Sequence, residues 1–160
     1  MPQYTVNEAA LTGFTHYAVF KHTDFDGDSA AGGIVKEFSV PAGSLLTDVA
    51  VHKVTNFTGG SISDCRLDIG YGGDGAGTID DFIDDADIFD GDEYVHNTGA
   101  ELVVNEGGSD TTETATFLFS SADTIDIEFT PTGDTMKNAT AGEVVVKFKI
   151  LSLSQDSELN

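Results

Sequence analysis

Three aspartates at alternate positions are the first residues whose types and spacing could do chemistry. Asp24, Asp26 and Asp28 stand in the segment DFDGDS. Carboxylate oxygens spaced in this way can fold round one Ca²⁺ ion. A helix–loop–helix calcium loop starting at Asp24 would need glycine at its sixth position and glutamate at its twelfth, where this chain has Ser29 and Val35. The segment therefore predicts either a site for Ca²⁺ or another cation, or a solvated acidic loop.

The densest acidic run lies between residues 80 and 92. Its aspartates are Asp80, Asp81, Asp84, Asp85, Asp87, Asp90 and Asp92. Paired carboxylates could act as general acid and base, as they do in glycosidases. That chemistry needs one carboxyl group held in an apolar pocket, and no residue pattern marks such a pocket here. A solvated face is the simpler interpretation, a halide- or cation-dependent surface is its main alternative, and a glycosidase-like enzyme is a further one.

Other catalytic patterns are missing from the sequence. The histidines His16, His22, His52 and His96 lack the spacing of a metal-binding motif, and no serine stands in a G-x-S-x-G segment. The glycine-rich segment 71–77 lacks the lysine of a phosphate-binding loop. Cys65 lies on the same face of its predicted strand as Leu67 and Ile69, which predicts a buried, inert thiol. We therefore expect no enzyme and no obligatory cofactor.

The chain is strongly acidic, with 28 Asp and Glu against 7 Lys and Arg and a net charge of −21. This charge repels nucleic acid and anionic lipid, and no run of 18 apolar residues occurs, so neither nucleic acid nor a membrane is an expected partner. The start MPQYTVNEAALTGF lacks the pattern of a secretory signal, which predicts synthesis in a cytoplasm. Because salt screens carboxylate repulsion, the composition favours a halophilic host, with an acidic surface on a mesophilic protein as the alternative.

The elements that must position these residues are mostly strands. Apolar residues alternate with polar ones in eight segments, which are residues 16–22, 34–40, 45–55, 65–70, 101–105, 114–119, 124–130 and 143–153. In the 124–130 segment Ile125, Ile127 and Phe129 face inward, so Asp126 is expected on the exposed face. Residues 78–89 change period, since Ile79, Phe82, Ile83 and Ala86 fall on one helical face. Residues 89–100 are predicted to be a loop.

These elements predict an all-β fold. The expected architecture is an antiparallel β-sandwich, jelly-roll-like, with about eight strands and one short helix. Residues 1–14 are predicted to be an N-terminal arm, residues 15–152 the sandwich domain and residues 153–160 a flexible tail. The arm has scattered apolar residues, namely Tyr4, Val6, Leu11 and Phe14, which suit a neighbour's groove or sheet edge better than a core of their own.

The order of turns and strands resembles that of small β-sandwich structural proteins of tailed viruses of bacteria and archaea. The resemblance covers about residues 15–152. It is carried by the Pro41-Ala42-Gly43 turn, the strand at Leu45–Thr55, the Phe57, Gly59, Gly60 turn, the strand end Leu67–Gly70, the Asp-rich segment after it, and the turn at Ala139–Glu143. The acidity of this chain departs from the common pattern and would fit a virus of a halophilic host.

The resemblance implies a virion protein without catalytic residues. Such a protein would decorate and stabilise an icosahedral head as a cement protein on the capsid surface. Its partner would be the major capsid protein, and its state a homotrimer or, alternatively, a pentamer. The contacts would come from the arm residues named above and from one end of the sandwich.

A carbohydrate-binding or receptor-binding module on a spike, turret or tail is the alternative. Such modules use exposed aromatic side chains, and Tyr71, Phe82, Phe89 and Tyr94 are the candidates for a surface-binding loop. The absence of tryptophan counts against this alternative.

Overall fold

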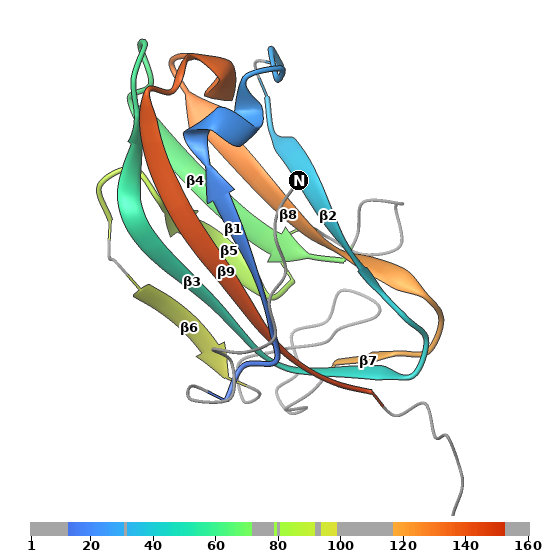
Figure 1. Cartoon of the computed structure of the whole chain (residues 1–160). Coiled ribbons are helices and arrows are strands. Elements are labelled where there is room, and N and C mark those ends of the chain that lie inside the picture. Colours follow the sequence, from blue (N-terminus) through green and yellow to red (C-terminus); the bar gives the residue numbers. More distant parts are fainter. Residues whose placement is uncertain are drawn as a thin grey trace, which may run out of the picture.

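Within the residues that it describes, the computed structural model places nine strands in two antiparallel sheets that pack face to face (Figure 1). It describes residues 13–30, 32–71, 79, 81–91, 94–98 and 117–152, with only the backbone described in 94–98. The strands are β1 His16–Lys21, β2 Ile34–Val40, β3 Ser44–Thr58, β4 Asp64–Gly70, β5 Ile83–Asp87, β6 Tyr94–Thr98, β7 Phe117–Phe119, β8 Asp123–Thr132 and β9 Ala141–Ser152. The predicted all-β sandwich is confirmed.

The strand order is that of a jelly roll. The first sheet has the order β1-β9-β3-β6, and the short β7 also pairs with β3. The second sheet has the order β2-β8-β4-β5. The last strands of the chain therefore lie between the first ones: β9 pairs with β1 and β3, and β8 pairs with β2 and β4. From β1 to β4, each strand lies in the opposite sheet from the one before it. This wrapping follows from two nested Greek keys, as the jelly-roll expectation requires.

The core between the sheets is built on phenylalanine. Phe129 on β8 lies centrally, with its ring centroid 5.2 Å from Phe20, 4.8 Å from Phe25 and 6.0 Å from Phe57. Phe148 on β9 is also fully buried and lies 5.3 Å from Phe38. Inward residues alternate along β9 as predicted, because each strand turns every second side chain toward the facing sheet.

The prediction of a helix within residues 78–89 is wrong. Residues 83–87 form strand β5, and the helices within the described residues are two short 3₁₀ turns elsewhere, η1 His22–Phe25 and η2 Met136–Asn138. A bulge explains the helical spacing. Asp85 has a positive φ of 57°, and the register with β4 shifts between Leu67 and Ile69. Ile83 and Ala86, three positions apart, can therefore both point into the core of a strand.

Two further expectations fail. The segment 89–100, predicted to be a loop, contains β6, whose residues pair with Asp48–His52 of β3. Asp126, predicted to be exposed, has no accessible surface and accepts a 2.7 Å hydrogen bond from the Thr124 hydroxyl. Alternation fixes the side of the sheet on which Asp126 lies, but burial on that side depends on neighbouring segments. The predicted strand at 101–105 lies outside the described residues.

At one end of the sandwich, the Asp134 carboxylate connects two loops by hydrogen bonds. Asp134 accepts hydrogen bonds from the backbone N–H groups of Ser61 and Thr135, at 2.8 and 2.9 Å, and from the side chain of Asn138 at 2.6 Å. These donors lower the pKa of Asp134. Asp134 thereby joins the β3–β4 turn to the loop after β8. Within the part of the chain that is described, no helix is long and apolar enough to cross a membrane.

Candidate interaction surface

The structure does not gather Asp24, Asp26 and Asp28 round a common point. Asp24 accepts the backbone N–H of Lys21 at 2.7 Å, and Asp28 forms a 2.9 Å ion pair with Lys36. Asp26 is exposed at the end of η1. The described residues contain no group of three or more acidic, histidine or cysteine side chains arranged to hold a metal ion. The Asp28 carboxylate acts here as an ion-pair partner, and a cation site at this loop stays a prediction.

Two of the four aromatic candidates for a surface-binding loop belong to the core. Tyr71 and Phe82 are 6% and 1% exposed, and their rings stack at 5.9 Å and both contact Phe117. The expectation that these two rings face solvent is therefore wrong. Phe89 is half-buried against the core. The side chain of Tyr94 lies outside the described residues.

The arm residues have separate outcomes. Tyr4, Val6 and Leu11 lie outside the described residues. Phe14 is 7% exposed and packs on Ala50, which is fully buried although its position in β3 faces outward. Thr15 follows, and its backbone N–H donates to the carbonyl of Phe148 at 2.9 Å. A truncation intended to leave the domain folded should therefore end before Gly13 rather than include Phe14.

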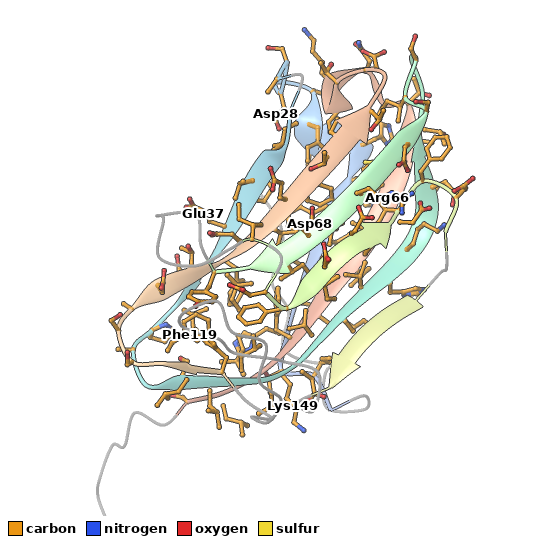
Figure 2. The ribbon with its side chains drawn as sticks, turned by 180° about the vertical axis from the view of Figure 1, so that it is seen from behind. Asp28, Glu37, Arg66, Asp68, Phe119 and Lys149 are labelled. Atoms are coloured by element: carbon orange, nitrogen blue, oxygen red, sulfur yellow. The ribbon has the colours of Figure 1, made fainter. Side chains whose placement is uncertain are left out.

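The outer face of the second sheet, called here the acidic face, carries seven carboxylates and one arginine at outward positions of its strands. Figure 2 views the molecule from this side, with Glu37, Asp68 and Arg66 labelled. Its outward carboxylates are Glu37, Asp64, Asp68, Asp85, Asp87, Asp126 and Glu128, and its basic residue is Arg66. Arg66 contacts Asp64 at 2.9 Å and Asp87 at 3.4 Å.

Two pairs of like charges face each other across the strands of the acidic face. Glu37 lies opposite Asp126, and Asp68 lies opposite Glu128. Burial and the nearby Asp68 carboxylate raise the pKa of Glu128. Burial alone would also raise the pKa of Asp87, but the backbone N–H groups of residues 89–91 and the Arg66 guanidinium outweigh it, so that pKa is lowered. The acidic face thus contains both stabilised and repelling carboxylates.

The outer face of the first sheet, called here the mixed face, differs in kind. Its outward residues on β1 and β9 are Tyr17, Val19, Lys21, Glu143, Val145, Lys147, Lys149 and Leu151. Lys21 lies 3.5 Å from Glu143, and Lys149 lies 3.6 Å from Asp48. This face therefore combines apolar side chains with nearly balanced charge in a chain of net charge −21.

A leucine row crosses the mixed face at one end. Leu45 on β3 lies opposite Leu118 on β7 and opposite Leu151 on β9. Leu118 is 51% exposed and Leu151 is 43% exposed. Each of the three leucines stands at the outward phase of its strand, where alternation favours a polar residue. For Leu118 and Leu151 this phase violation is visible in the sequence. Leu45 shares the phase of the buried Val49 and Val51 and points outward because the register shifts between Leu46 and Asp48. Contiguous exposed apolar side chains of this kind mark interaction sites.

Cys65 is buried as predicted, and its pKa is raised to about 12, first by burial and then by Asp64 and Asp87. We expect a thiol reagent at pH 8 to leave the native protein unlabelled, because the thiolate is the reactive form. Mass spectrometry should show one label per chain only after unfolding in guanidinium chloride. Rapid labelling of native protein would contradict the buried position.

Comparison with protein-family models, with curated proteins and with solved structures gave no match. The resemblance to virion proteins therefore stays a prediction.

Proposed function

We propose that this chain is a structural protein of a virion surface that decorates an icosahedral head and holds neighbouring capsid subunits together. The observation that carries the proposal is the leucine row, in which two side chains about half exposed lie on either side of Leu45. A protein partner would remove this apolar surface from water. The turn pattern shared with tailed-virus β-sandwich proteins supplies the kind of partner, the major capsid protein.

The mechanism is additive binding. Fully burying a leucine side chain contributes about 1.5–3 kcal/mol, and side chains that are already half-buried contribute less. Many identical copies on one shell each add such an interface, and together they oppose the outward pressure of a packaged genome. We expect the end of the mixed face that carries the leucine row to contact the shell, because the mixed face is nearly neutral. The acidic face would instead bring seven carboxylates against the shell.

The carbohydrate-binding alternative has weaker support, because Tyr71 and Phe82 are buried. An enzymatic role for the aspartates of residues 80–92 gains no support either. Among these, Asp85 and Asp87 contact Arg66, and Asp84 and Asp90 are exposed. None of these four aspartates therefore has its carboxyl group in an apolar pocket.

We expect the double variant Leu118→Ser, Leu151→Ser to lose at least tenfold in affinity for heads that lack the native protein, about 1.4 kcal/mol. The measurement is occupancy per head by quantitative gel analysis, together with particle survival on heating. Val54→Ser is the matched control, because Val54 is 50% exposed on β3 but lies outside the row. Equal occupancy for the wild type and the double variant would remove the leucine row from the interface.

A further inference from the structure

The central part of the mixed face has a self-complementary pattern. Along β9 the outward residues run Glu143, Val145, Lys147, so that an acid and a base lie on either side of a valine. Val145 lies opposite Val19 on β1 and opposite His52 on β3. The middle row is therefore apolar except for one imidazole, and the charged rows flank it.

We propose that two copies of this chain pair through the mixed face, with a two-fold axis that passes between the two sheets at Val145 and runs perpendicular to β9. Such an axis sets the two β9 strands antiparallel and places Val145 of each copy against Val145 of the other. Residues two positions before and after Val145 then exchange places. Glu143 of each copy meets Lys147 of the other, which gives two intermolecular ion pairs per dimer.

The charge distribution favours a second copy of this chain as the partner of the mixed face. Two chains of net charge −21 repel each other over most of their surfaces. On the mixed face the three lysines Lys21, Lys147 and Lys149 outnumber Glu143 and Asp48 by one, so the excess of carboxylates that repels two copies elsewhere is absent there. Among the described residues no carboxylate forms an ion pair with Lys147, which leaves its ammonium available to the Glu143 of another copy.

The leucine row takes no part in these ion pairs, because the same axis brings Leu151 level with Ala139 of the other copy, just after η2. Leu151 is six residues from Val145, which corresponds to roughly 20 Å along a strand. The antiparallel arrangement therefore places the two leucine rows at opposite ends of the dimer. The pairing does not depend on the proposed function, and because both use the mixed face, dimer formation and head binding should compete.

Charge reversal tests the pairing with purified full-length protein. Sedimentation equilibrium should show a monomer–dimer equilibrium for the wild type. Lys147→Glu and Glu143→Lys should each raise the dimer dissociation constant at least tenfold, because each places like charges together twice. The combined variant Lys147→Glu, Glu143→Lys restores complementarity and should return to within about threefold of the wild type.

The controls carry the same charge changes at distant positions. Lys137→Glu lies on η2, and Glu37→Lys lies on the acidic face. Both should leave the dimer dissociation constant within about threefold of the wild type. A wild type that stays monomeric at all concentrations, controls that respond as strongly as the test variants, or a combined variant that fails to recover would each overturn the proposal. Wild-type monomers that nevertheless bind heads would separate this failure from that of the proposed function.

Discussion

Replacing Phe129 with alanine should lower the free energy of unfolding by about 3–5 kcal/mol, the usual cost of truncating a fully buried aromatic residue. The Phe129 ring lies at the centre of the core and contacts three other phenylalanines, on β1, η1 and β3. Its removal leaves a cavity that strands from both sheets border. Because these strands are fixed by backbone hydrogen bonds, they cannot collapse fully into the space.

Urea titration monitored by circular dichroism measures this change. Leu118→Ala is the matched control, since a side chain 51% exposed on β7 should cost less than about 1 kcal/mol. Asp126→Ala should fall between the two, at about 1–3 kcal/mol, because Asp126 is buried and hydrogen-bonded to Thr124. A cost for Phe129→Ala that is no larger than that of the control would contradict the central position of this ring.

The second large effect is stabilisation by salt. We expect the melting temperature to rise by at least about 5 °C between about 0.1 and 3 M KCl. The net charge of −21 opposes the compact state, and the cross-strand pairs Glu37 with Asp126 and Asp68 with Glu128 add local repulsion of about 0.2–1 kcal/mol each. Salt screens both terms because the Debye length falls from about 10 Å to below 3 Å.

Glu128→Gln tests the local part of this effect. It should raise the melting temperature at low salt and reduce the salt-dependent increase. The matched control Glu143→Gln should lower the melting temperature slightly or leave it unchanged, because Glu143 pairs with Lys21. Melting curves that do not respond to KCl would contradict the role of repulsion and remove the argument for a halophilic host.

The same groups determine the pH dependence of stability. The pKa of Glu128 is raised in the folded state, so its contribution to stability decreases as pH rises from about 4.3 through the folded value. The pKa values of Asp87 and Asp134 are lowered, so their contributions are present above about pH 3.9 and are lost as pH falls toward their folded values. Stability should therefore increase on mild acidification from pH 7 and decrease below about pH 4.

The sequence by itself determined the all-β class and most strand positions. The alternation in Ile125, Ile127 and Phe129 and along 143–153 predicts strands whose inward faces the structure confirms. Alternation is reliable because it follows from the pleat of a single strand and needs no information about neighbours. The burial of Cys65 followed from the same local rule.

Tertiary structure decided the features that depend on contacts between distant segments. The bulge at Asp85 gives β5 the spacing of a helix, and only its pairing with β4 reveals a strand. Tyr71 and Phe82 look exposed in a glycine- and aspartate-rich context but pack on Phe117. The leucine row exists only because the registers of β7 and β9 both align with Leu45 of β3, and strand register is set by pairing partners far apart in sequence.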